Sequence, residues 1–144
     1  MKNIVLMVLV ATLGFLNGCG SSTSLPTMTG TWVFTLTPQA SPSNVIQATA
    51  MLTQISDSVF GQVTLTGNGT ACGTTAMMSG IVNGNALALH LTQAQSTLTF
   101  TGKASASFTS SASGTYTATT GKCLQNGGTG TWSAFLVPNN SSSF

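Results

Sequence analysis

From Thr29 onward, apolar and polar residues alternate along short runs, and Gly, Asn and Pro separate one run from the next. In the first run, residues 29–37, the side chains of Trp32, Phe34 and Leu36 point to one face and those between them to the other. A period of two is typical of β-strands that bury one face. Seven similar runs follow, over residues 45–54, 58–67, 74–82, 86–92, 96–103, 111–119 and 130–138. The chain is therefore predicted to be all-β, with eight strands.

The first and last runs share the phrase TGTW, at residues 29–32 and 129–132. In an eight-stranded antiparallel meander, the first and last strands can pair and close a barrel, which removes exposed sheet edges. This pattern predicts an antiparallel up-and-down β-barrel over residues 29–138, with Trp32 and Trp132 near opposite ends. Several inward positions carry Gly or Ala, so either the interior holds a cavity or large rings fill it. The side-chain volumes alone leave both alternatives open.

A different pattern precedes the barrel. Lys2 is followed by an apolar run from Ile4 to Leu16, which is too short for a membrane core that needs about 20 residues. Such a run is typical of the hydrophobic region of a signal peptide, so residues 1–18 are predicted to form a helical signal peptide.

The residues Leu16-Asn17-Gly18-Cys19 resemble the lipobox of bacterial lipoproteins. The resemblance implies cleavage before Cys19 and acylation of that residue, so that acyl chains hold the protein on a membrane. Gly20, where some lipoproteins have Asp, implies the outer membrane of a cell envelope. Residues 19–28 would then be the lipidated cysteine and a flexible tether, and residues 139–144 a polar C-terminal tail. The alternative is an ordinary secretory signal followed by a chance cysteine.

The mature chain resembles a group of uncharacterised bacterial lipoproteins with small lipocalin-like barrels. The motifs that carry this resemblance are Gly30-Thr31-Trp32, Cys72, Gly114-Thr115-Tyr116, Cys123 and Gly130-Thr131-Trp132. The resemblance implies a lipocalin-like β-barrel, and it raises the alternative of a carrier for a small apolar ligand. The side chains that would contact such a ligand inside the barrel are Trp32, Phe34, Leu89, Phe100, Tyr116 and Trp132.

With Cys19 acylated, Cys72 and Cys123 remain as a candidate pair. Cys72 follows the third predicted strand and Cys123 the seventh, and loops after odd strands share one end of an up-and-down barrel. Export exposes both thiols to an oxidising compartment. We therefore expect a disulfide, which would stabilise the fold by about 4 kcal/mol in the chain-entropy model.

Charged residues are rare, and this excludes several function classes. The sequence contains Lys2, Lys103, Lys122 and Asp57, with no Arg and no Glu. Nucleic-acid binding needs several cationic contacts, so no nucleic-acid partner is expected. Asp57 lies in a predicted turn, and His90 alternates with core leucines and so should face outward. No catalytic constellation, metal site or cofactor is expected from these residues, and the protein is not predicted to be an enzyme.

The tether enters the first strand, so the loops after odd strands should lie at the rim far from the membrane. Loops held on a rigid scaffold are common recognition sites. The leading hypothesis is a non-catalytic binding or cell-envelope surface module. The remote alternative is a small transmembrane barrel whose Leu and Phe face meets lipid. The recognition surface at the far rim is predicted to include Cys72, Gly73, Lys122, Leu124, Gln125 and Asn126.

Overall fold

The computed structural model describes residues 27–70, 73–94, 96–104, 110–118 and 128–138. In these ranges the chain forms eight strands and one 3₁₀ turn, η1 (Asn68–Thr70). The strands are β1 (Gly30–Pro38), β2 (Ile46–Ile55), β3 (Ser58–Gly67), β4 (Thr75–Asn83), β5 (Ala86–Gln93), β6 (Ser96–Ala104), β7 (Ser111–Ala118) and β8 (Gly128–Leu136). Within the described part of the chain, no helix is long and apolar enough to cross a membrane.

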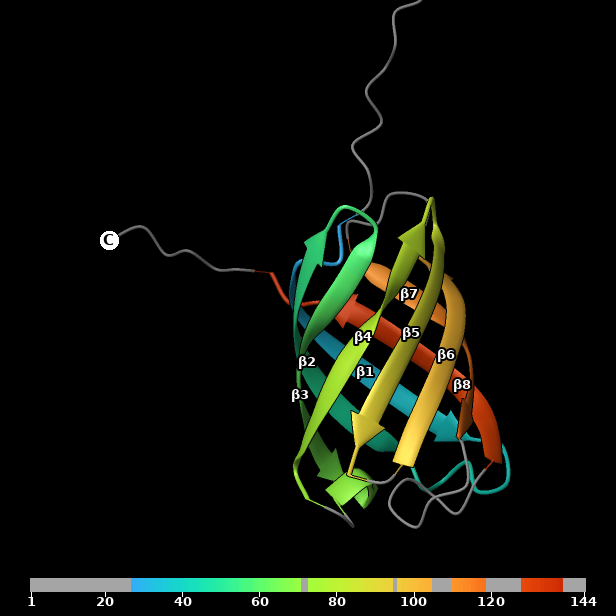
Figure 1. The fold of residues 1–144 in the computed structure, drawn as a ribbon. Coiled ribbons are helices and arrows are strands. Elements are labelled where there is room, and N and C mark those ends of the chain that lie inside the picture. The colour runs from blue at the N-terminus through green and yellow to red at the C-terminus, as the bar shows by residue number, and fades with distance from the viewer. Residues whose placement is uncertain (1–26, 71–72, 95, 105–109, 119–127, 139–144) are drawn as a thin grey trace, which may run out of the picture.

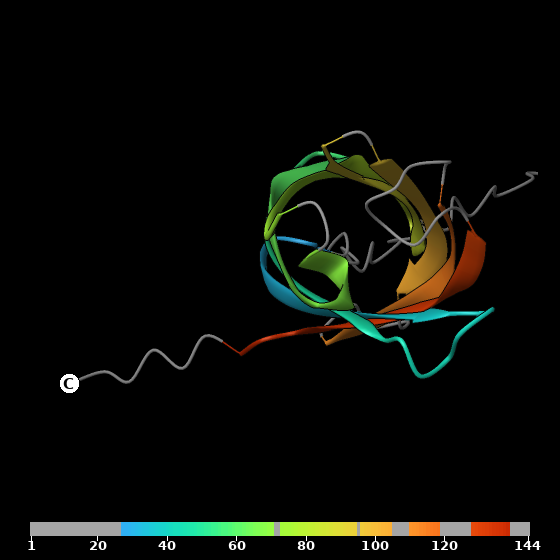
Figure 2. The same ribbon diagram turned by 90° about the horizontal axis from the view of Figure 1, so that it is seen from below.

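The strands form one closed barrel in sequence order (Figure 1). Each strand pairs antiparallel with its neighbour in sequence, and β1 also pairs with β8. The view along the barrel shows the closed wall (Figure 2). The eight-stranded up-and-down barrel predicted from the sequence is thus confirmed.

The closing pair of strands places the two tryptophans as predicted. Trp32 is level with Leu136 at the end of β8, and Trp132 is level with Leu36 near the end of β1. The backbone of Trp32 is thus nearer the end of the barrel where β1 begins and that of Trp132 nearer the end where β1 finishes, while the Trp132 ring reaches Phe34 and Phe100 in the middle.

The barrel wall separates an apolar interior from a mainly polar exterior. On β1, the side chains of Trp32, Phe34 and Leu36 are buried inside, and the same alternation holds on the other strands. The alternation therefore predicted the inner face correctly. Most outward positions carry Thr, Ser or Gln, unlike the continuous apolar band that a transmembrane barrel presents to lipid.

The packed domain begins before the predicted boundary at Thr29. The side chain of Met28 is fully buried, although the sequence pattern placed this residue in the flexible tether. Its carbonyl accepts a hydrogen bond of 3.0 Å from the indole N–H of Trp32. A methionine after a Ser, Thr and Pro segment gives no periodic signal, so the pattern could not reveal this contact.

The two ends of the barrel differ in their connections. The end where β1 begins, here called the tether-side end, carries the tight β2–β3 and β4–β5 turns. The Asn83–Ala86 pair closes the β4–β5 hairpin, whose two loop residues are Gly84 and Asn85. Only Gly84 of these two has a positive φ, 59°, which fits a type II′ turn, since a type I′ turn needs a positive φ at both loop residues. The described strands β1, β3, β5 and β7 all end at the opposite end of the barrel, the far rim, as predicted.

Candidate functional site

The middle of the barrel is filled by aromatic rings. Phe34, Phe100, Tyr116 and Trp132 contact one another, with ring centroids between 5.8 and 6.4 Å apart. Trp32 and Leu89, the other two residues predicted to meet an interior ligand, are also buried. The structure therefore brings four of the six together, and there they serve as packing partners for each other.

The indole of Trp132 packs against glycines and backbone carbonyls of β6 and β7. Gly102 of β6 pairs with Gly114 of β7, which in turn pairs with Trp132 of β8. The indole N–H donates to the carbonyls of Thr101 and Thr115, at 3.1 Å each. A Cβ atom on Gly102 would lie 2.5 Å from the indole ring. These glycines thus make room for the ring and let the strands approach closely. At these two positions, the small residues accommodate a large ring and do not line a cavity.

At the far rim, a buried amide joins two loops. Gln93, at the end of β5, is only 1% exposed. Its side-chain N–H₂ donates to the carbonyls of Gly69 in η1, at 3.2 Å, and Gly73, at 2.5 Å. Its Oε1 atom has no hydrogen-bond partner among the described residues. This contact holds the β3–β4 connection against the end of β5.

The predicted rim surface can be placed only in part. Gly73 is exposed and has a φ of 115°, a value that favours glycine. Lys122, Leu124, Gln125 and Asn126 lie outside the described residues, as do the predicted disulfide partners Cys72 and Cys123 and the predicted lipidation site Cys19. The proposals for these residues remain sequence predictions.

A groove of about 590 Å³ lies at the far rim, over the outer face of β7, β8 and the end of β1. Gln39 fixes one side of it, because its backbone N–H donates to the carbonyl of Thr129 at 2.9 Å. The Thr129 hydroxyl donates in return to the Gln39 side-chain carbonyl at 2.8 Å. The lining residues are Thr37, Pro38, Gln39, Pro42, Thr115, Tyr116, Thr117, Thr129, Gly130 and Thr131.

The groove offers hydroxyls and apolar rings without a formal charge at neutral pH. Tyr116 is its single titratable lining residue, and burial raises the pKa of this phenol above its usual value of 10.0. The sequence missed this site. Its outward threonines alternate as in any strand, and only the register aligns Thr37, Thr131 and Thr115 in one row across three strands.

His90 and Asp57 lie on different elements and make local contacts. His90 is exposed on β5, as predicted, with its Nδ1 atom 3.3 Å from the Thr99 hydroxyl. Asp57 lies in the β2–β3 turn, where its carboxylate accepts a long hydrogen bond of 3.4 Å from Ser58. Among the residues that the structure describes, no group of three or more His, Cys, Asp or Glu side chains could hold a metal ion.

Comparisons with known proteins identify the fold and no family. No family model matches the chain, and no curated protein matches it. Among solved structures, the chain is similar to intact afifavidin in its apo form, with 18% sequence identity and a TM-score of 0.57. The match covers 85% of this chain and 90% of that one. The likeness establishes an avidin-like eight-stranded barrel.

Proposed function

We propose that this protein is a non-catalytic binding module of the cell envelope, anchored by acyl chains on Cys19, which recognises an uncharged ligand at its far rim. The groove on β7, β8 and β1 carries this proposal. Its volume of about 590 Å³ lies within the range of about 300–1,000 Å³ that is common for ligand sites.

The lining chemistry supports an uncharged ligand. Thr hydroxyls and the Gln39 side chain can exchange hydrogen bonds with hydroxyl or amide groups, and the exposed ring of Pro42 adds apolar surface. A charged ligand would lose hydration in the groove without gaining a counter-charge. A neutral glycan or a peptide backbone therefore fits this surface better than a phosphate or a carboxylate.

The packing of the interior favours a surface site over an internal carrier site. The four rings, packed edge-on or tilted against one another, occupy the space that an internal ligand would need. The barrel's likeness to the apo form of afifavidin is consistent with a binding role, because barrels of this size can hold one small ligand. At 18% identity it does not indicate where this chain would bind.

Substituting arginine for a threonine in the groove tests whether the groove is the binding site. Thr131→Arg adds bulk and charge to the groove, and Thr64→Arg makes the same change on the outer face of β3. Native mass spectrometry of protein purified from its own envelope should show a bound species on the parent and on Thr64→Arg, but not on Thr131→Arg. A bound species that survives Thr131→Arg would place recognition elsewhere and contradict the groove.

The anchor has its own test. Cys19→Ser removes the thiol that would be acylated, so this variant should leave the membrane fraction and appear in the soluble fraction. If it stays as membrane-bound as the parent, the lipoprotein interpretation is wrong.

A further inference from the structure

One part of the outer wall departs from its polar composition. Five large apolar side chains on β2, β3 and β4 are between 45% and 69% exposed. They are called here the Phe60 patch, and they are Met51, Ile55, Phe60, Met77 and Ile81. An exposed single apolar residue is ordinary, but a contiguous patch of this kind marks an interaction surface.

The strand register shows that the patch is contiguous. Phe60 lies directly opposite Thr53 of β2 and Ser79 of β4. The other four apolar residues are two positions along from these partners, so they occupy the four diagonal positions around Phe60. Diagonal neighbours on one face are about 7–8 Å apart, within reach of long side chains.

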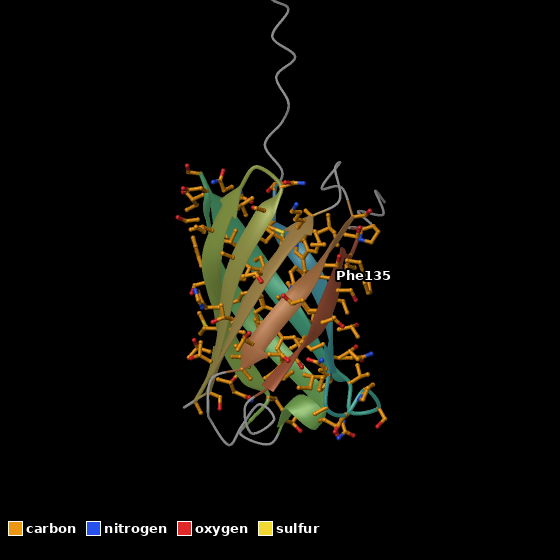
Figure 3. All side chains as sticks on the ribbon, turned by 90° about the vertical axis from the view of Figure 1, so that its right-hand side faces the viewer. Phe135 is labelled. Carbon is orange, nitrogen blue, oxygen red and sulfur yellow. The ribbon has the colours of Figure 1, made fainter. Side chains whose placement is uncertain are left out.

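The patch continues beyond β2. Met51 is diagonal to Val33 of β1, which is directly opposite Phe135 of β8. Phe135 is 52% exposed, and its side chain lies on the outside of the barrel (Figure 3). The Phe60 patch, Val33 and Phe135 include no charged residue. This surface is therefore suited to contact with an apolar phase and unsuited to a charged partner.

The chain enters the barrel at the edge of the patch. The backbone N–H of Met28 donates to the side-chain carbonyl of Gln54 at 2.7 Å, and the backbone N–H of Gln54 donates to the Thr29 hydroxyl at 3.0 Å. Gln54 immediately precedes Ile55 of the patch. Eight residue steps separate Thr27 from Cys19, and they span at most about 30 Å when fully extended. A bilayer that holds Cys19 is thus within reach of the patch.

We propose that the Phe60 patch docks on the surface of the bilayer in which Cys19 is anchored. This inference rests on the proposed acylation of Cys19. The barrel then lies inclined on its β2–β4 side, with the outer residues of the patch among the lipid headgroups. The groove stays open to ligand because β7 is opposite β3 in an eight-stranded ring, and because its residues Thr37 and Thr131 lie at the far rim, four positions along β1 and β8 from Val33 and Phe135.

The charge pattern specifies the kind of membrane. The patch carries no Lys or Arg, so anionic lipids offer it no electrostatic gain, and Asp57 in the adjoining turn would be repelled by them. We therefore expect docking on zwitterionic bilayers, with little dependence on salt, because the interaction is apolar burial.

The experiment uses the acylated full chain in phosphatidylcholine vesicles. An environment-sensitive dye is attached to Thr53→Cys, inside the patch, or to Ser113→Cys, on the outer face of β7 as a matched control. The parent chain under the same labelling corrects for its own cysteines. On reconstitution, the dye at position 53 should shift to shorter wavelength and be quenched by lipid-borne quenchers, whereas the dye at position 113 should not change. Adding Phe60→Ser and Ile81→Ser should abolish the response at position 53.

The possible outcomes distinguish failure of the patch to dock from failure of Cys19 to be acylated. Protein that floats with vesicles but shows no response at position 53 keeps the anchor and overturns docking. Protein that fails to float overturns the anchor, and with it the docking that depends on it. A response at position 53 without vesicles, together with a dimer in sedimentation that Phe60→Ser dissociates, would assign the patch to a second copy of this chain and overturn the bilayer as its partner.

Discussion

Gly102 faces Trp132 so closely that a Cβ atom on the glycine would lie 2.5 Å from the indole. The missing side chain of Gly102 thus leaves room for the ring, whose indole N–H donates to a carbonyl of β6 and a carbonyl of β7. Core positions of this kind tolerate added volume poorly.

We expect Gly102→Val to lower the free energy of unfolding by about 1–3 kcal/mol or more, because the added side chain would clash with the backbone carbonyl of Ser113 and with the Trp132 ring, and one of them must shift. Urea denaturation followed by Trp fluorescence measures this. Ser113→Val, at an outward position on the neighbouring strand, should change stability by less than about 0.5 kcal/mol. Equal effects of the two changes would contradict the role assigned to Gly102.

Replacing Gln93 with Glu should make the stability of the fold depend on pH. Burial disfavours the carboxylate, and the carbonyls of Gly69 and Gly73 favour the protonated acid, so the folded-state pKa of Glu at this site lies above its unfolded value of about 4.3. An acid with a raised folded pKa loses stability as pH rises above its unfolded pKa. Gln93→Glu should therefore be less stable at pH 7 than at pH 4, relative to the parent.

Gln93→Leu is the matched control for that pH series. It leaves the carbonyls of Gly69 and Gly73 without their donor, so it should cost about 1–3 kcal/mol at every pH. Thermal unfolding at pH 4 and pH 7 distinguishes the two variants. If Gln93→Glu and Gln93→Leu respond to pH alike, the amide does not hold the rim in the way described.

Tyr116 makes the native fold sensitive to alkali. It is the single tyrosine of the chain, and burial raises its pKa above 10.0. The unfolded chain then loses the phenolic proton at a lower pH than the folded chain, so stability falls as pH rises above about 10. Ultraviolet titration of the phenol should show the raised pKa, and Tyr116→Phe should remove this part of the stability loss. A phenol that titrates normally in the folded protein would contradict its burial.

The Cys72–Cys123 disulfide remains a prediction from topology and compartment. Both flanking connections lie at the far rim, after β3 and after β7. Non-reducing peptide mapping of the exported protein should yield the two cysteine peptides as one linked species. Reduction should lower stability by about 4 kcal/mol in the chain-entropy model. Two free thiols in freshly exported protein would exclude the bridge.

The strands were predictable because one rule governs each of them. Residues such as Phe34 and Leu89 alternate with polar neighbours, and burial of one face follows directly from the pleat. The repeated TGTW phrase was enough to suggest closure. Met28 and Gln93 escaped notice because their burial depends on single long-range contacts, to Trp32 and to the carbonyls of Gly69 and Gly73.

The candidate site was less predictable than the fold. The rim loops were expected to carry recognition, yet the groove is built largely from outward threonines of β7 and β8, such as Thr117 and Thr131. The apolar patch around Phe60 was equally hidden, since Met51 and Ile81 are far from Phe60 in sequence and each becomes its neighbour only through the register. Alternation predicts which face a residue occupies, but not which residues of other strands lie beside it.

The ladder between β1 and β8 also sets an order for folding. It pairs Thr35 with Ser133, 98 residues later in the chain, so the wall cannot close until the last strand is available. Contacts of such long sequence separation form slowly, because loop-closure entropy is lost before they stabilise the fold. Until then β1 and the newest strand are open edges, which are prone to pair with other chains. In an exported chain, this late closure postpones folding until Gly128–Leu136 has crossed the membrane.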